Sequence, residues 1–518
     1  MTEAAGAHQS IDSGSPATRG AGAIEWTARL ALGLVLIVAI FFRLYALGRL
    51  PGVNGDEAWY GVQAHHWLSG EAAAWRTPNG NVPGPLHMGL VVGLESIFPP
   101  SFALLRIPAV ISSIAAAILA YAIARRFFDR TTAAAALVLM AVLPINIAYA
   151  RYGWDPSHSA LVVLAALYAA LAGRAYLAAA LFAFAIAVHP TNVFAAPFLG
   201  LAYFGALMED KRPQPWRNAV LFAMLLVLAV FLIAATTANA GASRSMQEMV
   251  MRLTDPGEYI RFPLSFARLL SGDTVLAYLT GEGWGAARPA ADLLTGVVVL
   301  ALLVAGLLKL RLAPFGRPMG LVAGWASSIL FFFLLAGSEA LQPHYERYGF
   351  VLVAPTVMML AMLAGKCVPD RWRGGRFNIM LAVLALPLLA AFWVGYFRRL
   401  EEGRPDQHRA FWTGPVEPKE RALQLIAADA QPGGATVVAE DWWLEWPIAY
   451  LADGHPLRVV GPGGSIGSGP SLAGRHYWVA YKGGTLDRRL AGGREAVPAW
   501  TIDTGYPGHK LRVWRSRQ

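Results

Sequence analysis

Two adjacent carboxylates, Asp56 and Glu57, follow directly after the first long apolar run of the chain. They begin a polar segment in a sequence that is otherwise dominated by apolar stretches. Ionisable groups beside a bilayer are costly to desolvate, so their presence there indicates a function. We expect a site that accepts a proton or binds a cation at the boundary between water and lipid.

Other polar side chains lie in further connections between apolar runs. A carboxylate on one wall of a site can take the proton of an acceptor hydroxyl. Arg, His and Tyr on another wall can stabilise the charge that grows on a departing phosphate. Beyond the carboxylate pair, the candidate residues are Tyr60, Arg151, Asp155, His189, His344, Tyr345, Arg347 and Tyr348.

Transmembrane helices must position these residues. The chain has 518 residues, of which 56% are hydrophobic and 15% charged, and its mean hydropathy is +0.44. This composition is typical of a mainly α, polytopic membrane protein. About eleven apolar runs are long enough to cross a hydrocarbon core. They cover residues 26–48, 102–124, 131–150, 157–173, 175–189, 191–208, 217–238, 290–308, 319–337, 348–365 and 378–397.

The distribution of cations predicts the orientation. Lys and Arg are concentrated in alternate connections, for example at 125–130, 309–317 and 366–376. Such connections are cytoplasmic under the positive-inside rule. The N-terminus is then inside, and the C-terminus and the loops 49–101 and 238–289 are outside. The net charge of +10 mostly reflects this topology, and the sequence has no clustered basic patch with aromatic residues that would indicate a nucleic-acid partner.

The two ends of the chain differ from the middle. Residues 1–23 are small and polar, which predicts a disordered cytoplasmic tail before the transmembrane domain of residues 24–400. Residues 401–518 are polar and rich in glycine, and they predict a small extracytoplasmic α/β domain. Its expected helices are 418–430 and 443–451, and its expected strands are 435–440, 457–460, 476–482 and 510–514.

The sequence also limits the cofactors. It has a single cysteine, Cys367, and no His spacing that indicates a metal site. A divalent cation nevertheless remains compatible with the carboxylates. There is no glycine-rich phosphate loop and no cytoplasmic domain to hold a nucleotide. An enzyme working on the outer face must therefore take its activated group from a molecule already in the membrane, and a lipid-linked donor meets this condition.

The ordered set of motifs resembles one family. It comprises Asp56-Glu57 after a membrane exit, Pro83-Gly84-Pro85-Leu86, Leu105-Arg106-Ile107-Pro108, Arg151 with Asp155, and Glu346-Arg347-Tyr348. The chain resembles the polyprenyl-phosphate-dependent glycosyltransferases of the GT-C class, which include protein O-mannosyltransferases and the aminoarabinose transferases of lipid A. Order and spacing match over roughly the first 200 residues, and the remainder matches mainly in topology.

The resemblance implies roles for individual residues. The first-loop Asp is the expected catalytic base, which corresponds to Asp56, and the second-loop acid corresponds to Asp155. The Arg-Tyr pair expected near the donor phosphate corresponds to Arg347 and Tyr348. The resemblance also implies a bacterial cytoplasmic (inner) membrane. The chain lacks the large inserted soluble domain of the protein mannosyltransferases.

Structural roles compete with these assignments. Asp56 and Asp155 could each cap a helix, because Asp is a favoured N-cap residue. Arg151 could pair with Asp155 one helical turn away, and Glu57 could orient Asp56 or be a solvated acid in a first helical turn. His189 could contact substrate or simply lie at the membrane interface. A final group could stack on sugar rings but is expected in the core of the C-terminal domain: Trp442, Trp443 and Trp446.

The function we predict is an integral membrane glycosyltransferase. It moves a sugar from a polyprenyl-phosphate carrier to a hydroxyl of an extracytoplasmic glycan, lipid or protein. Its catalytic residues are Asp56, Glu57 and Asp155, its donor-phosphate residues are Arg347, Tyr348, His344, Tyr345 and Arg151, and its substrate-binding residues are Tyr60 and His189. The alternative is a transporter or flippase of a lipid-linked saccharide, which should place its ionisable groups at mid-membrane on broken helices.

Overall fold

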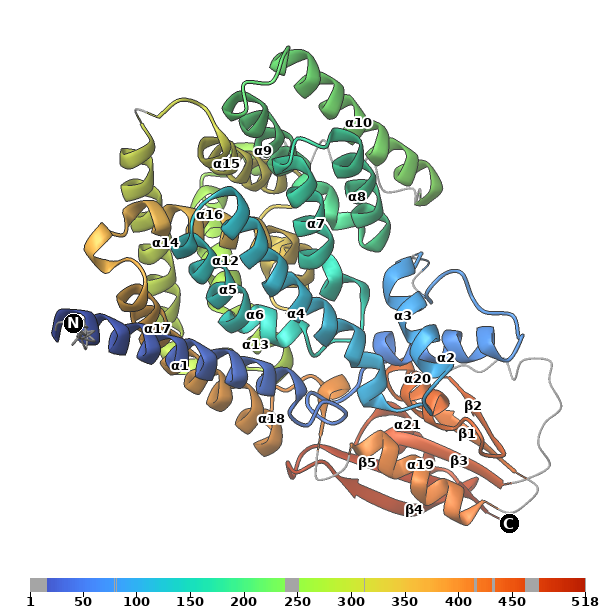
Figure 1. The fold of residues 1–518 in the computed structure, drawn as a ribbon. Helices are drawn as coiled ribbons and strands as arrows, with labels where there is room; N and C mark the ends of the chain where they lie inside the picture. Colours follow the sequence, from blue (N-terminus) through green and yellow to red (C-terminus); the bar gives the residue numbers. More distant parts are fainter. Residues whose placement is uncertain are drawn as a thin grey trace, which may run out of the picture.

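A computed structural model describes residues 16–517 except 79, 81, 238–250, 312, 414–416, 431–433 and 462–474. A bundle of apolar helices carries a small α/β domain at one end (Figure 1). The bundle helices are α1 (Pro16–Leu44), α2 (Gly55–Leu68), α3 (Pro85–Glu95), α4 (Phe102–Phe127), α5 (Arg130–Val142), α6 (Pro144–Tyr149), α7 (Ser159–Leu171), α8 (Ala175–Val188), α9 (Ala196–Glu209), α10 (Pro215–Thr237), α12 (Glu258–Ser271), α13 (Asp273–Thr280), α14 (Arg288–Leu310), α15 (Arg317–Leu335), α16 (Val353–Cys367), α17 (Gly375–Phe392) and α18 (Arg399–Glu402). Short 3-10 turns join several of them, including η1 (Asp155–His158), η2 (Pro190–Ala195), η5 (Glu346–Tyr348) and η6 (Phe350–Leu352).

Apolar helices occupy all eleven predicted spans. Seven helical segments are long and apolar enough to cross a membrane, among them Phe102–Phe127 and Glu346–Cys367. The other four predicted spans coincide with shorter apolar helices at Arg130–Val142, Asp155–Leu171, Ala175–Val188 and Pro215–Phe231. The mainly helical membrane fold is therefore confirmed, while the number of eleven crossings stays a prediction.

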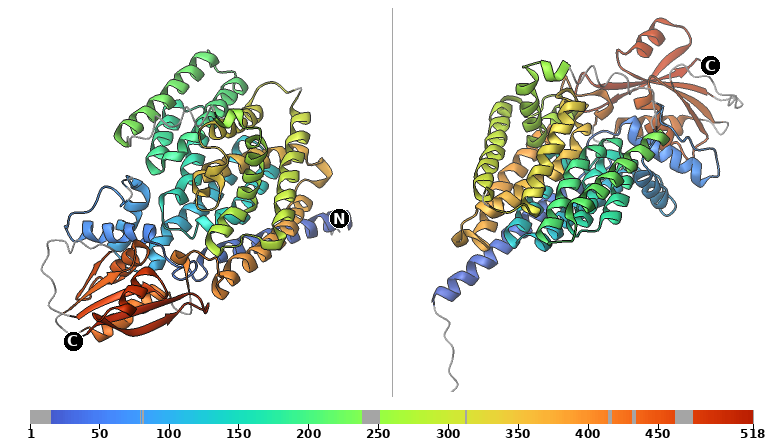
Figure 2. Two further views of the ribbon diagram at one scale, coloured as in Figure 1. Left: turned by 180° about the vertical axis from the view of Figure 1, so that it is seen from behind. Right: turned by 90° about the horizontal axis from the view of Figure 1, so that it is seen from above.

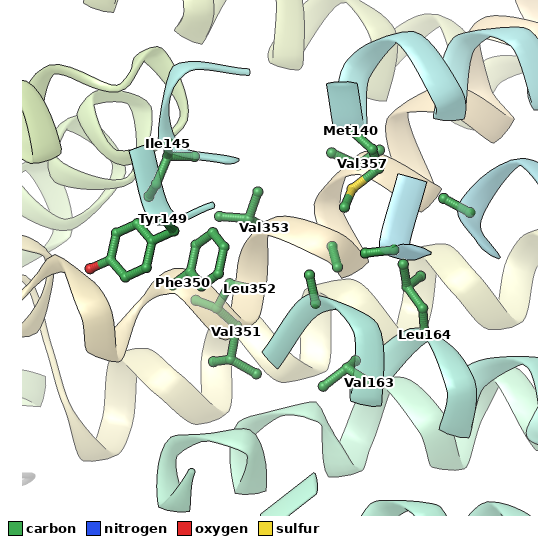
Figure 3. Close-up of a cluster of buried hydrophobic side chains, with 14 of the residues drawn as sticks. Met140, Ile145, Tyr149, Val163, Leu164, Phe350, Val351, Leu352, Val353 and Val357 are labelled. Carbon is green, nitrogen blue, oxygen red and sulfur yellow. The ribbon is translucent and has the colours of Figure 1, made fainter. Parts of the chain in front are cut away.

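The centre of the bundle is formed by α16 and the turns before it. In the most apolar 18-residue stretch of Glu346–Cys367, 83% of the residues are buried inside the protein. The corresponding share in Gly285–Leu310 is 11%. The latter segment, which includes α14, is therefore at the periphery of the bundle. Phe350 stacks on Tyr149 with the ring centroids 4.3 Å apart, within the buried cluster of Figure 3. The chain just before α16 is thus held rigidly against α6.

Small residues allow two helices of the bundle to approach closely. A Cβ atom on Gly205 of α9 would lie 2.5 Å from the Gly316 carbonyl oxygen, and one on Gly320 of α15 would lie 2.6 Å from the Leu201 carbonyl oxygen. Apolar side chains gain little by leaving lipid for a helix interface, so association depends on close backbone packing of this kind. The glycines therefore make the contact between α9 and α15 possible.

The C-terminal domain is a five-stranded sheet with three helices. The helices are α19 (Pro418–Asp429), α20 (Trp442–Leu451) and α21 (Thr485–Gly492), and the strands are β1 (Ala435–Ala439), β2 (Leu457–Val460), β3 (Arg475–Tyr481), β4 (Ala496–Asp503) and β5 (Lys510–Ser516). The strand order is β2-β1-β3-β5-β4, with β1 parallel to β2 and β3 and with β5 antiparallel to β3 and β4.

Every predicted element of this domain is present, but the sequence interpretation omitted α21 and β4. β4 contains Pro498 and has a register shift between Pro498 and Trp500. A proline in a run of residues argues against a strand prediction. Proline nevertheless occurs at bulges and in edge strands of sheets. β4 pairs only with β5, so it is an edge strand of the described sheet, where the missing N–H costs little.

The C-terminal domain rests on the loop 49–101 through α20. The Tyr450 hydroxyl lies 3.1 Å from the Ser101 amide nitrogen, and His65 Nε2 lies 3.2 Å from Asp453 Oδ1. The sequence predicts amphipathic helices on the membrane surface at Glu57–Leu68 and within about Leu86–Phe98, with Tyr60, Ala64, Trp67 and Leu68 on one face of the first. Both segments contain helices, α2 and α3. Tyr60 and Ala64 are buried, whereas Trp67 and Leu68 are exposed. The first part of that face therefore packs within the protein, and its last turn is exposed.

Helix α1 begins within the predicted N-terminal tail. Helix α1 begins at Pro16, so residues 16–23 are helical, and residues 1–15 lie outside the described part of the chain. Figure 2 shows the beginning of α1 and the C-terminal domain at opposite ends of the molecule.

The charge pattern predicts an extracytoplasmic C-terminus. A reporter fused after Gln518 should behave as extracytoplasmic, and one fused at Arg371 should behave as cytoplasmic, because alternate connections carry the cations. Alkaline phosphatase and fluorescent-protein fusions measure the two locations. The opposite pattern would move every candidate residue to the other face.

Candidate active site

A cavity of about 380 Å³ lies where the loop 49–101, two turns of the bundle and the C-terminal domain meet. We call it the interdomain cavity. Its size falls in the range of roughly 300–1,000 Å³ that is common for small-ligand sites. Its lining residues are Asp56, Trp59, Tyr60, Thr77, Pro78, Val82, Pro83, Trp154, Asp155, Pro156, His189, Pro190, Thr191, Arg347, Tyr348, Trp442 and Trp446.

Asp56 lies in the first turn of α2 and does not cap that helix. The N-cap residue is Asn54, whose side chain accepts a hydrogen bond from the Glu57 amide at 3.0 Å. Within the described structure, the Asp56 carboxylate has no hydrogen-bond or ion-pair partner of its own, although it faces the interdomain cavity. Burial raises the pKa of Asp56 to about 6, against the opposing effect of Arg347. A carboxylate with this pKa can accept a proton near neutral pH, which is the chemistry that the sequence predicts for Asp56.

Asp155 is the second carboxylate of the cavity, and it is held by two donors. The Tyr60 hydroxyl and the Gly84 amide both donate to its Oδ2, the latter at 2.6 Å. A Cβ atom on Gly84 would lie 2.7 Å from Asp155 Oδ1, so this position needs a glycine. Oδ1 itself is buried without a partner, and an orphan acceptor of this kind suits a ligand hydroxyl or a cation.

Arg347 and Tyr348, in the turn η5 before α16, lie on the bundle wall of the cavity. The Arg347 guanidinium lies over the rings of Trp154 and Tyr348, at 5.5 Å and 5.0 Å from their centroids. Nη1 donates to the His344 carbonyl at 2.9 Å. Among the described residues Arg347 has no ion-pair partner, so this partly buried cation is available to an anionic ligand.

His189 also lines the cavity, between α8 and η2. Its Nδ1 lies 2.6 Å from the Thr191 hydroxyl. Burial, and to a smaller extent the charge of Arg347, lower the pKa of His189 to about 3. The ring is therefore neutral at physiological pH and can act as a hydrogen-bond partner for a substrate, the role that the sequence suggests.

Glu57, unlike its neighbour, lies outside the cavity. It is fully buried in a two-pronged ion pair with Arg106, with both N–O distances 2.8 Å, and it accepts the Gly153 amide at 2.8 Å. Its remaining bond closes the capping box with Asn54. The assignment of Glu57 as a catalytic residue is corrected: its carboxylate ties α2 to α4 and to the segment before Asp155.

Loss of this charge should destabilise the protein. In Glu57→Gln, Arg106 keeps its positive charge in a buried position without a counter-charge, which typically costs about 3–5 kcal/mol. We expect a clearly lower thermal midpoint in detergent than for the control Glu71→Gln, which removes an exposed carboxylate of the same loop. Equal midpoints for the two variants would contradict the structural role of Glu57.

Arg151 is not a phosphate-binding residue in this arrangement. It is fully buried, and its guanidinium donates to the carbonyls of Phe42, Tyr45 and Leu50 and lies over the Phe397 ring. It does not pair with Asp155. These hydrogen bonds hold the chain that leaves α1, so Arg151 positions the entrance to the loop 49–101. Its predicted contact with the donor phosphate is corrected.

His344 and Tyr345 do not line the cavity either. The His344 ring packs edge-on against Tyr278, and Tyr345 is 49% exposed and stacks on Tyr348. The prediction that these two residues share a cavity with Asp56 is therefore wrong, and it holds only for Arg347 and Tyr348. Successive residues of η5 and of the chain before it point in different directions, so the four neighbouring side chains do not all face the cavity.

Sequence reasoning missed several residues of the cavity wall. Trp154 lies between Arg151 and Asp155, within a motif that was recognised, yet it was given no role. Trp442 and Trp446 were expected in the core of the C-terminal domain, but both line the interdomain cavity. Three tryptophans within five positions were the available signal, and only the docking of α20 decides which of them face the site.

No group of three His, Cys, Asp or Glu side chains that could hold a metal ion occurs within the described segments. The two carboxylates of the cavity, Asp56 and Asp155, are the residues that would contribute to a cation bound together with a substrate phosphate.

The fold is similar to solved glycosyltransferase structures. One is ArnT from Cupriavidus metallidurans bound to undecaprenyl phosphate, with a TM-score of 0.53, 16% identity, and coverage of 95% of this chain and 98% of that chain. Another is the archaeal oligosaccharyltransferase AglB from Archaeoglobus fulgidus, with a TM-score of 0.47, 13% identity, and coverage of 83% and 64%. No protein-family model and no curated protein sequence matches the chain. The resemblance to the GT-C class is confirmed at the level of the fold.

Proposed function

We propose that the chain is an integral membrane glycosyltransferase that uses a polyprenyl-phosphate-linked sugar. Asp56 is the base, Arg347 and Tyr348 bind the donor phosphate, and Asp155 with Tyr60 holds substrate hydroxyls. The observation that carries this proposal is that Asp56, from the first loop, and Arg347, from the turn before α16, face one cavity. A proton acceptor and an unpaired cation on facing walls suit displacement of a phosphate by a hydroxyl.

The reaction is a single displacement at the anomeric carbon. The acceptor oxygen forms a bond to this carbon while the bond from the carbon to the phosphate oxygen breaks. The acceptor proton passes to Asp56, and the polyprenyl phosphate leaves with the bonding electron pair, facing Arg347. Attack from the side opposite the leaving group inverts the configuration of the sugar.

The position of the ionisable groups favours an enzyme over a transporter. Asp56, Asp155 and Arg347 line one cavity together with Trp442 and Trp446 of the C-terminal domain, and this domain lies at one end of the bundle (Figure 1). A transporter would need its polar groups at mid-membrane and a path between two faces. The likeness of the fold to ArnT, which was crystallised with undecaprenyl phosphate, supports a lipid-phosphate donor.

A deletion strain tests the proposal. Mass spectrometry of its lipids and envelope glycans should show one sugar missing from an extracytoplasmic product and a polyprenyl-phosphate sugar accumulating in the membrane. A transporter defect would instead trap the saccharide on the cytoplasmic leaflet. In intact spheroplasts, a membrane-impermeant oxidant distinguishes the two cases, because it reaches only saccharides on the outer leaflet. An unchanged lipid and glycan profile would refute both functions.

The pKa of Asp56 predicts the pH dependence of transfer. A base must be ionised to act, and the ionised fraction falls about tenfold per pH unit below the pKa. With that pKa raised by burial to about 6, kcat/KM should be constant above neutral pH and should fall with a slope of one on the acid side. A profile from pH 4.5 to 8.5 measures this, and a rate that stays flat down to pH 5 would exclude Asp56 as the titrating base.

A further inference from the structure

Helix α20 contributes two tryptophans to a cavity whose other chemistry lies in the membrane domain. Trp442 and Trp446 line the interdomain cavity together with Asp56. Neither ring is needed to fill the core of its own domain, which is built by Leu444 and Ile448 on the opposite side of α20. Both rings are partly exposed, although large aromatic side chains are normally buried where they can be.

Trp442 lies directly beside the base. A Cβ atom on Gly55, the residue before Asp56, would lie 2.6 Å from Trp442 Cε3. The indole therefore packs on the backbone of the first turn of α2, where any larger residue would push it away. Trp443 stacks behind Trp442 with the centroids 3.8 Å apart and holds its ring plane. The molecule that gives its proton to Asp56 must therefore lie next to this ring.

The same cavity contains polar atoms without partners. The indole N–H groups of Trp446 and Trp154 and the Oδ1 atom of Asp155 are all buried with no hydrogen-bond partner in the described structure. Unsatisfied buried donors and acceptors are uncommon and costly in a finished core. Two donors and one acceptor around flat aromatic faces fit a ligand that presents hydroxyl groups at its edge and C–H groups on its face.

We propose that Trp442 and Trp446 form a carbohydrate-binding wall, and that the acceptor of the transferred sugar is itself a saccharide. A sugar ring stacks on Trp442, one of its hydroxyls meets Asp56, and other hydroxyls pair with Trp446 Nε1 and Asp155. This inference rests on the proposed function and gives the C-terminal domain a direct part in acceptor recognition. A simple lipid acceptor with no further polar groups beside its reacting hydroxyl would leave the orphan donors unsatisfied.

Saturation-transfer NMR with the purified full-length protein tests the wall. The probes are methyl glycosides of glucose, galactose, mannose and N-acetylglucosamine, and polyprenyl phosphate without a sugar. The wild type should transfer saturation to the ring C–H protons of at least one glycoside. Trp442→Leu should reduce this signal at least fivefold, and Trp442→Tyr should restore part of it, because a smaller ring still stacks.

Two controls separate stacking from docking of the domain. Tyr450→Phe removes the hydrogen bond to Ser101 but leaves both cavity tryptophans, so its glycoside signal should match the wild type. In Trp442→Leu the affinity for polyprenyl phosphate should stay within twofold of the wild type, because the phosphate lies at Arg347. A glycoside signal unchanged in Trp442→Leu, or lost equally in Tyr450→Phe, would overturn the wall.

A further comparison identifies which sugar the wall binds. If Trp442→Leu loses affinity for a sugar-bearing polyprenyl phosphate but keeps affinity for the bare lipid phosphate, the ring holds the transferred sugar and the acceptor assignment fails. If the wild type binds glycosides but no polyprenyl phosphate, the wall stands and the proposed donor fails. The failure of the inference and the failure of the proposed function therefore give different results.

Discussion

The Asp56→Asn variant should insert, bind the lipid donor and transfer sugar on the order of 100- to 10,000-fold more slowly than the wild type. Asparagine keeps the shape of the side chain but cannot accept the proton of the acceptor hydroxyl. The substitution is structurally mild here, because Asn54 caps α2 and Asp56 has no partner among the described residues that would be lost. The defect should therefore lie in kcat and not in the amount of folded protein.

Transfer by purified protein in detergent, with the donor in excess, measures this effect. Glu71→Gln is the matched control, since it removes an exposed carboxylate from the same loop without touching the cavity, and it should retain wild-type rates. Binding of polyprenyl phosphate should be similar in Asp56→Asn and the wild type. Full activity in Asp56→Asn would contradict the assignment of Asp56 as the base.

The Arg347→Lys variant should lose transfer by about 100- to 1,000-fold, the usual effect of removing one preorganised donor at a site of developing charge. Lysine keeps the positive charge but loses the planar fork that can bind two phosphate oxygens. It also loses the stacking geometry of the guanidinium between Trp154 and Tyr348, which fixes the direction of its donors. The ammonium group of lysine is a point charge, so it cannot contact two phosphate oxygens while negative charge grows on the leaving oxygen.

Rates and lipid affinity together check this prediction. In Arg347→Lys the affinity for polyprenyl phosphate should fall as well, which distinguishes it from Asp56→Asn. The control Arg398→Lys changes an exposed arginine in the helical segment that follows α17, which pairs with Glu402 and does not line the interdomain cavity, and it should behave as the wild type. Wild-type turnover and affinity in Arg347→Lys would remove Arg347 from the donor site.

Local sequence patterns determined the apolar helices, the C-terminal domain and the choice of Asp56 as a candidate. A helix that crosses a bilayer needs a long apolar run, and this requirement is visible one segment at a time. The strands β1, β2, β3 and β5 were likewise apparent from short runs bounded by turn residues. These features depend on neighbours in the chain, so a single sequence contains them.

The difference between Asp56 and Glu57 could not be predicted in the same way. Consecutive residues on a helix point about 100° apart, so one of the two carboxylates had to face away from the site. Which one does so depends on Arg106, which is distant in sequence and pairs with Glu57 in the interior. The position of Arg151 could not be predicted either. Its partners are backbone carbonyls near the end of α1, and no side-chain pattern predicts these contacts.

Only the tertiary structure decided that the C-terminal domain belongs to the site. The sequence shows that Asp441–Trp446 is rich in aromatic residues, and an isolated small domain would bury them in its own core. The docking of α20 on α2 instead turns Trp442 and Trp446 toward Asp56. The sequence by itself determined which segments form apolar helices and which acids are candidates for chemistry. The packing of distant segments decided which of those acids meets Arg347, because burial, charge pairing and cavity walls all arise from contacts between residues far apart in the chain.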